Sequence, residues 1–167
     1  HFMTSRYQAP FAPGGSAPID RALAERLLAV ALEQGGDYAD LFFEYAVNGS
    51  YGYDEGLLKS AGRYVTMGLG VRVMQGDATG YAYVESLDWD ALTHAARTAS
   101  QIARGGKSVA PVALTSQTLP VRYPVVQHSL DVEGIAKRAL LERADRAARA
   151  LDSRIVKVTA SLNEELR

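Results

Sequence analysis

The sequence predicts an α+β fold in which an antiparallel β-meander is packed by amphipathic helices. Two kinds of periodicity support this prediction. Apolar residues recur at helical spacing within residues 19–34, 88–104 and 131–151, and they alternate with polar residues within 39–47, 66–83 and 155–162. The first strands follow one another with only short turns between them, which is typical of antiparallel pairing. A third helix and a last strand then begin the next part of the sheet.

Composition limits the classes of function. The 167 residues suit one domain, or one domain and the start of another, and 47% of them are hydrophobic. A formal net charge of -1 argues against a broad basic surface for nucleic acid. The absence of cysteine excludes disulfides, thiolate metal sites and cysteine nucleophiles, and it fits a reducing compartment. No apolar run approaches the roughly 20 residues that span a bilayer, and no signal peptide is recognised, so we expect a cytoplasmic protein without membrane contact.

The chain divides into four segments by composition. We interpret His1 and Phe2 as non-native leftovers at the start of a flexible, proline- and glycine-rich lead-in. The expected segments are the lead-in (1–17), a helix–meander–helix domain (18–106), a proline-rich connector (107–130), and a helix and strand (131–167) that continue towards the missing remainder of a longer protein.

The first helix is predicted from Ile19 to Gln34. Ser16 is the expected N-cap, and Gly35 and Gly36 can end the helix. Its apolar stripe comprises Ile19, Leu23, Leu27, Val30 and Ala31.

The meander is predicted to begin with a strand over residues 39–47. Asn48-Gly49 is expected to form a tight hairpin turn because both residue types tolerate positive φ. A return strand over 50–53 would then be broken at residues 54–56, and 57–60 can continue the sheet. Residues 66–74 form the next strand, and a turn at 75–77 leads to its partner at 79–85.

The second helix is predicted from Asp88 to Arg104, and the third from Asp131 to Leu151. The expected buried stripe of the second helix is Leu92, Ala95, Ala99 and Ile102. That of the third is Val132, Ile135, Ala136, Ala139, Leu140, Ala147 and Leu151. The pairs Glu133–Lys137 and Glu142–Arg146 have i,i+4 spacing and are expected on its solvent side.

No segment carries the pattern of a catalytic or metal site. His94 and His128 are isolated, whereas zinc needs three or four converging ligands. There is no HExxH helix and no Gly-x-Ser-x-Gly elbow. The adjacent carboxylates Asp54-Glu55 and Glu164-Glu165 point apart, so neither forms a catalytic dyad. We therefore assign no catalytic, metal or cofactor-binding residue in this chain.

Two glycines in one strand are the first candidate for a contact site. Gly68-x-Gly70 lacks the third glycine and the helix of a dinucleotide-binding loop. Alternate glycines on one strand face, together with Arg72, indicate close approach by another backbone. We favour a packed helix, and the alternative is another chain or an extended peptide.

The tyrosines are the second candidate. Six of the nine lie in the meander, and Tyr81 and Tyr83 share one strand face. Aromatic residues are common in half-buried sheet positions, and they are equally typical of interfaces. Gly68, Gly70, Arg72, Tyr81 and Tyr83 are therefore the possible interface or peptide-facing residues.

Several ordered stretches resemble the amino-terminal domain of the TldD/PmbA family. They are Asp37–Phe43 after a helix, Gly68–Arg72, Gly76–Tyr83, Asp152–Arg154 and Val158–Leu162. The resemblance covers about Ile19 to Leu162, and its order and spacing are more specific than any single stretch.

The resemblance implies a function for a longer parent protein. A TldD subunit is similar to a zinc metallopeptidase whose HExxxH motif lies downstream of this region, and it pairs with a metal-free PmbA/TldE-like subunit to cleave peptides or unfolded proteins. The family was formerly described as a modulator of DNA gyrase. The expected partners are the rest of the subunit, a TldE/PmbA-like subunit or a second copy, and peptide substrate. The chain itself lacks HExxxH, so we expect no zinc and no activity in it.

Two other functions stay open from the sequence. One is an interaction module, either the front domain of a PmbA/TldE-like partner or a stand-alone assembly domain. The other is a gyrase-binding regulator, which the near-neutral charge disfavours if it acts by direct DNA contact. Residues 40–42 and 158–162 look closer to TldD.

Overall fold

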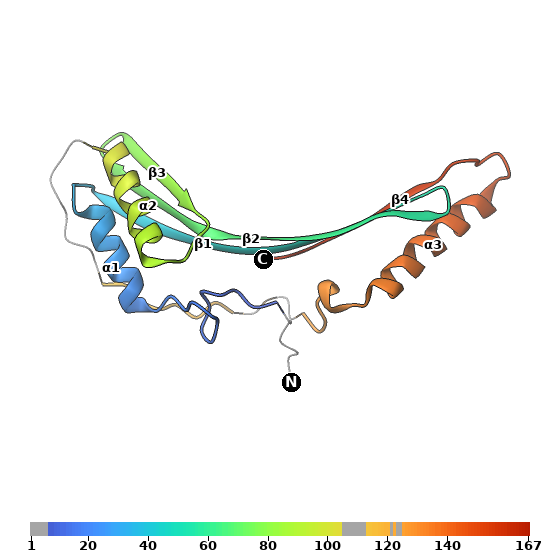
Figure 1. Cartoon of the computed structure of the whole chain (residues 1–167), viewed down its shortest axis with the longest axis horizontal. Coiled ribbons are helices and arrows are strands. Elements are labelled where there is room, and N and C mark those ends of the chain that lie inside the picture. The colour runs from blue at the N-terminus through green and yellow to red at the C-terminus, as the bar shows by residue number, and fades with distance from the viewer. Residues whose placement is uncertain (1–6, 105–112, 121, 123–124) are drawn as a thin grey trace. The chain divides into compact units, whose positions relative to one another are not determined.

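A computed structural model describes residues 7–104, 113–120, 122 and 125–167. These residues form an antiparallel four-stranded sheet with three α-helices and one short 3₁₀ helix, which confirms the predicted α+β class (Figure 1). None of the helices in this part of the chain is long and apolar enough to cross a membrane. The connector predicted over 107–130 and the lead-in lie partly outside the described residues.

The sheet has the order β3–β2–β1–β4. Its strands are β1 (Tyr38–Asp54), β2 (Leu57–Gln75), β3 (Ala78–Val84) and β4 (Thr159–Leu166). The outer strands are much shorter than the two central ones. β3 pairs with Leu69–Gln75 of β2, whereas β4 pairs with Val47–Asp54 of β1. Among the described residues, each central strand therefore has a stretch that pairs with the other central strand alone.

The hairpin predicted at Asn48-Gly49 is wrong, because β1 continues through both residues to Asp54. The chain reverses instead at Glu55 and Gly56, where φ is 52° and 76°. Two-residue hairpin turns commonly require positive φ at both central residues. Gly49 is needed for a different reason: its partner on β4 is Glu164, and the Glu164 side chain occupies the space that a Cβ would take.

The chain forms two compact units. One comprises residues 8–45 and the described part of 66–120, and the other comprises Tyr7, residues 46–65 and the described part of 121–167. β1 and β2 contribute to both. In the first unit, the helices α1 (Arg21–Leu32) and α2 (Trp89–Ile102) pack on one face of the sheet (Figure 1).

The core of the first unit is apolar and fully covered. Leu69, Val71 and Val73 of β2 have no exposed surface, and they pack against Leu27 of α1 and Ala96 of α2. Burying side chains of this size contributes about 1.5–3 kcal/mol each. The alternation that the sequence predicts for this strand is confirmed.

The first two helices lie close to their predicted positions. The N-cap of α1 is Asp20, not Ser16, because the Asp20 carboxylate accepts a hydrogen bond from the backbone N–H of Leu23 at 2.8 Å. At the end of α2, Ile102 is exposed and Ala103 is buried, so the last member of the predicted stripe is also wrong. Ala103 caps the helix and still donates its backbone N–H to the Ala99 carbonyl, so the buried side continues four residues after Ala99 rather than three.

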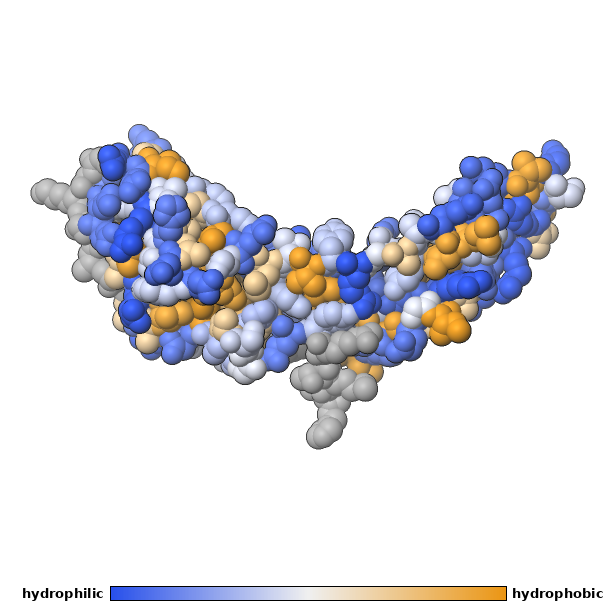
Figure 2. Space-filling model, viewed as in Figure 1, coloured by the Kyte–Doolittle hydropathy of each residue, from blue (hydrophilic) through white to orange (hydrophobic). Residues whose placement is uncertain are grey.

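The second unit contains the helix α3 (Gly134–Leu151), preceded by a 3₁₀ turn at Ser129–Asp131. The burial predicted for α3 is wrong. The helix turns Lys137, Leu141 and Asp145 inwards, whereas Ile135, Leu140 and Leu151 are exposed. Figure 2 shows apolar side chains at the surface here. The physical reason is an ion pair between Lys137 and Glu164 of β4, which fixes the rotation of the helix.

The predicted ion pairs of α3 change with that rotation. Lys137 is buried rather than paired with Glu133 on the solvent side. Glu142 accepts a hydrogen bond from Arg138, not Arg146, at 2.7 Å.

The last strand is present, but it begins later than residue 155. The Thr159 hydroxyl donates to the carboxylate of Asp54 at 3.0 Å, and this bond holds the pKa of Asp54 below its usual value.

Gly80 of β3 provides a test of the helix–sheet contact. A Cβ at this position would overlap the backbone carbonyl of Ala99 in α2. We predict that Gly80→Ala lowers the free energy of unfolding by about 1–3 kcal/mol, the usual cost of overpacking. Gly62→Ala is the matched strand control, because its Cβ would meet only the Ser50 hydroxyl at 3.8 Å. Urea unfolding followed by circular dichroism measures both, and equal stabilities would contradict this packing.

Candidate functional site

The face of β2 that points away from the helices carries the candidate residues Gly68, Gly70 and Arg72. They alternate with the core residues Leu69 and Val71. In the register with β3, Gly70 pairs with Tyr83 and Arg72 pairs with Tyr81. The structure therefore brings all five predicted residues together on one surface, which we call the open face. Tyr38, Asp40 and Phe42 of β1 extend it, since their neighbours Ala39, Leu41 and Phe43 pack against the core.

The two glycines are covered by tyrosines of the same sheet. A Cβ on Gly68 would lie 2.5 Å from the Tyr83 hydroxyl oxygen, and one on Gly70 would lie 2.5 Å from that of Tyr81. The favoured expectation of a packed helix over these glycines is therefore wrong. The physical reason is that both helices occupy the opposite face, so the adjacent strand supplies the cover. Rings lying over strand glycines restore the packing that glycine itself lacks.

An ion pair lies between β1 and β2 on the open face. The Arg72 guanidinium donates to both carboxylate oxygens of Asp40, at 3.1 and 2.5 Å. The same contact raises the pKa of Arg72 above its usual value. The pair is half-exposed, so it fixes orientation more than it adds stability.

The aromatic residues of the open face are exposed to solvent. The exposed fraction is 50% for Tyr38, 62% for Phe42, 55% for Tyr81 and 43% for Tyr83. The Tyr83 hydroxyl donates to the backbone carbonyl of Met67 at 3.2 Å. Partial burial, and next the charges of Glu85 and Glu44, raise the pKa of Tyr83. The open face thus combines partly ordered aromatic rings with neighbouring charged groups. This combination is typical of surfaces that contact polypeptide.

Metal ligands do not gather in the described part of the chain. No group of three or more His, Asp or Glu side chains there could hold an ion. His94 is exposed on α2, and His128 precedes the 3₁₀ turn in the other unit. The residues present do not fit a zinc site.

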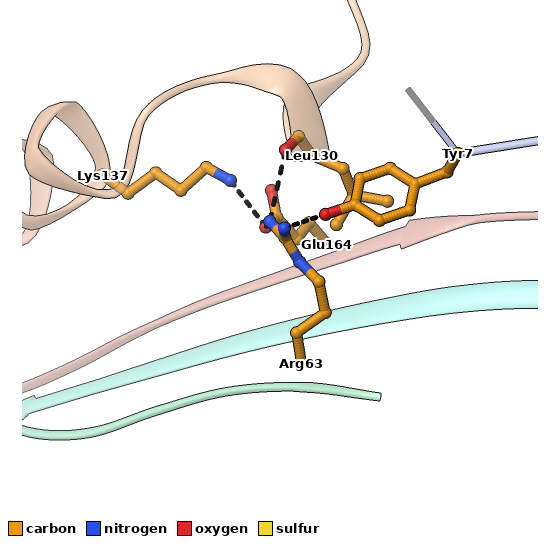
Figure 3. Close-up of polar contacts among 5 residues, drawn as sticks. All are labelled: Tyr7, Arg63, Leu130, Lys137 and Glu164. Atoms are coloured by element: carbon orange, nitrogen blue, oxygen red, sulfur yellow. Dashed lines mark hydrogen bonds and ion pairs between the residues drawn. The ribbon is translucent and has the colours of Figure 1, made fainter. Parts of the chain in front are cut away.

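The second unit contains a buried charge cluster that the sequence analysis missed (Figure 3). Lys137 of α3 donates to Oε1 of Glu164 on β4 at 2.7 Å, and the two side chains are only 4% and 2% exposed. Arg63 of β2 lies 3.6 Å from the same oxygen, and it donates to the carbonyl of Leu130 at 3.2 Å and to the Tyr7 hydroxyl. Two strands, β2 and β4, and the start of α3 are thereby joined through one carboxylate.

Gly49 makes room for this cluster. A Cβ there would lie 2.5 Å from Oε1 and 2.7 Å from Cγ of Glu164. The Lys137 ammonium also lies 5.4 Å from the centre of the Tyr51 ring. The sequence offers one signal for this cluster, which is a glycine within an alternating strand. The pairing of β1 with β4, which places Gly49 opposite Glu164, cannot be predicted from the sequence.

Comparison with known families identifies this fold. Residues 39–103 match the model of PmbA/TldA metallopeptidase domain 1. A metalloprotease TldD homolog of Haemophilus influenzae is 33% identical over 129 residues, which are 76% of this chain and 27% of that protein. The chain belongs to the TldD/PmbA family.

Further relatives agree with this assignment. A metalloprotease TldD homolog of Buchnera aphidicola subsp. Acyrthosiphon pisum is 31% identical, over 75% of this chain and 26% of its own length. The chain thus spans about a quarter of the TldD homologues that it matches.

Solved structures share the fold at lower identity. A candidate modulator of DNA gyrase from Bacteroides thetaiotaomicron has a TM-score of 0.61 at 17% identity, covering 86% of this chain and 34% of that one. Another from Thermotoga maritima has a TM-score of 0.54 at 17% identity, covering 84% and 32%.

Because the Lys137–Glu164 pair is buried, we expect its loss to lower the free energy of unfolding more than the loss of a neighbouring exposed pair. Lys137→Met should cost about 3–5 kcal/mol, because it leaves Glu164 buried without its closest cation. The double variant Lys137→Met/Glu164→Leu should recover most of this loss. Arg138→Met, which breaks the neighbouring exposed pair with Glu142, should cost under about 1 kcal/mol. Urea unfolding of the chain gives all three values. Equal losses for Lys137→Met and Arg138→Met would show that the buried pair does not hold α3.

Proposed function

We propose that this chain is the non-catalytic amino-terminal domain of a TldD-like zinc metallopeptidase subunit. The complete subunit cleaves peptides or unfolded proteins, and the open face of this domain contributes to the substrate chamber or to the subunit interface. The observation that carries the second part concerns the described residues of the first unit: α1 and α2 lie on one side of the sheet, and exposed aromatic rings lie over glycines on the other.

The physical case for contact at the open face rests on preorganisation. Tyr81 and Tyr83 lie over Gly70 and Gly68, so less side-chain freedom is lost when a partner covers them. Arg72 and Asp40 orient each other and offer polar contacts between the rings. Exposed aromatic residues flanked by charge are typical of protein interfaces.

The second unit supports contact with further polypeptide. Ile135 and Leu151 of α3 are 79% and 83% exposed, and Val156 just after the helix is 83% exposed. Clusters of exposed apolar residues commonly mark interaction sites. The remainder of the parent subunit is the partner that we propose here.

A PmbA/TldE-like front domain or a stand-alone interaction module is the alternative. The curated relatives at 33% and 31% identity are TldD homologues, and this favours the TldD-like assignment. A helix with HExxxH in the downstream reading frame would distinguish the enzyme from the metal-free partner.

The open face can be tested in the complete subunit. We predict that Tyr81→Ser lowers peptide cleavage or subunit assembly by about tenfold or more, the effect of losing an interface hot spot. Tyr64→Ser is the matched control, since Tyr64 is 63% exposed on β2 but lies outside the open face. It should change either quantity by less than about threefold. Light scattering measures assembly, and normal values for Tyr81→Ser in a folded protein would refute this role.

The assignment of catalysis to the parent makes a separate prediction. The 167-residue chain contains only three histidines, at positions 1, 94 and 128, and no cysteine. It should therefore bind zinc weakly in calorimetry and release no fragments from an unfolded protein substrate. Submicromolar zinc affinity or cleavage by the purified chain would place the active site in this domain after all.

A further inference from the structure

We propose that the outer edge of β1 in the first unit is a strand-addition site for an extended peptide that alternates apolar and basic residues. The first observation is a cleft of about 810 Å³, which is large enough for several side chains. Its apolar lining includes Leu28 and Leu32 of α1 and Leu41 and Phe43 of β1.

The cleft follows the edge of β1 rather than one of its faces. Tyr38 and Asp40 belong to the open face, whereas Ala39 and Leu41 pack towards the core, yet all four line the cleft. Successive residues of a strand point to opposite sides of the sheet, so only a cleft at the strand's edge meets both sets.

The backbone along this edge has no partner strand among the described residues. β1 lies between β2 and β4, but β4 pairs only with Val47–Asp54. Residues 38–46 are therefore an edge in the part of the chain that the structure describes. An open edge offers alternate N–H and C=O groups to an incoming strand, and these groups bind backbone regardless of sequence.

The side chains around the edge specify what the peptide carries. On the helix side, a peptide residue would meet Leu28, Leu32 and Phe43, which suits an apolar side chain. The cleft is also lined by three acidic residues and one basic residue: Asp20, Asp37 and Asp40 against Arg21, a net charge of -2. If Arg72, the partner of Asp40, is added, the sum is still -1. The net negative charge of the cleft lining as a whole therefore favours a peptide that carries lysine or arginine between its apolar residues.

This site goes beyond the proposed function, since it uses the backbone edge of β1 and the cleft beside α1, and it shares only Tyr38 and Asp40 with the open face. The two proposals can fail separately, because each has a residue that the other does not use. Tyr81 of β3 belongs to the open face and does not line the cleft, whereas Ala24 of α1 lines the cleft and does not belong to the open face.

The direct test uses a fluorescein-labelled heptapeptide of alternating valine and lysine and the 167-residue chain. Fluorescence anisotropy should show saturable binding that weakens as salt is added. A peptide of the same composition with its valines and lysines in separate blocks should bind at least about tenfold more weakly, and so should one of alternating valine and glutamate. Absence of binding, or equal affinity for the alternating and block lysine peptides, would overturn the proposal.

Backbone methylation tests the pairing itself. In an added strand, only every second N–H points to the protein. N-methylation of one alternate set of peptide residues should therefore abolish binding, and methylation of the other set should change it less than about threefold. Equal effects of the two sets would exclude strand addition.

Two chain variants locate the site. Ala24→Trp fills the cleft and should weaken binding of the alternating peptide by about tenfold or more, while Tyr64→Ser, an exposed residue of the other unit, should leave it within about threefold. Normal binding to a folded Ala24→Trp chain would overturn the site. A second copy is the competing occupant of the edge. If the chain is dimeric in light scattering and Ala24→Trp makes it monomeric, the edge pairs with itself and the peptide proposal is wrong.

Discussion

The alternation of side chains along β2 is the constraint on which the first unit depends. Leu69, Val71 and Val73 must face α1 and α2, because together they supply the apolar centre of that core. Because successive side chains of a strand point to opposite faces, their neighbours Gly68, Gly70 and Arg72 must then lie on the opposite face. Both helices lie on the core side. Among the described residues it is β3 that covers the glycines, with the rings of Tyr81 and Tyr83 and the backbone of Val84. The aromatic open face is thus a consequence of how the core is built.

A different interaction controls the second unit. Glu164 can be buried only because Gly49 has no side chain opposite it and because Lys137 supplies a cation. A buried charge without a partner is expensive, so this pair dictates which side of α3 faces the sheet. The apolar stripe of the helix is left outside as a result. These exposed apolar residues are the ones for which we propose contact with the remainder of the parent subunit.

The sequence predicted what depends on local periodicity and missed what depends on pairing between distant segments. The helices and the core face of β2 followed from repeats of 3.6 and 2 residues. The turn prediction at Asn48-Gly49 was wrong because a dipeptide that favours turns can also lie within a strand. Here Gly49 leaves space for the side chain of its strand partner, Glu164. The position of Tyr81 and Tyr83 over the glycines required the β2–β3 register, and the burial of Lys137 required knowledge of β4. Neither can be derived from one segment of sequence.

The central claim is that the open face of the first unit is a contact surface of a larger protein. A structure of the complete subunit, alone or with its partner, tests this most directly. We predict that Tyr38, Phe42 and Tyr81, which are half or more exposed in this chain, become mostly buried against another domain, another subunit or bound peptide. A complete assembly in which these rings stay open to solvent would contradict it.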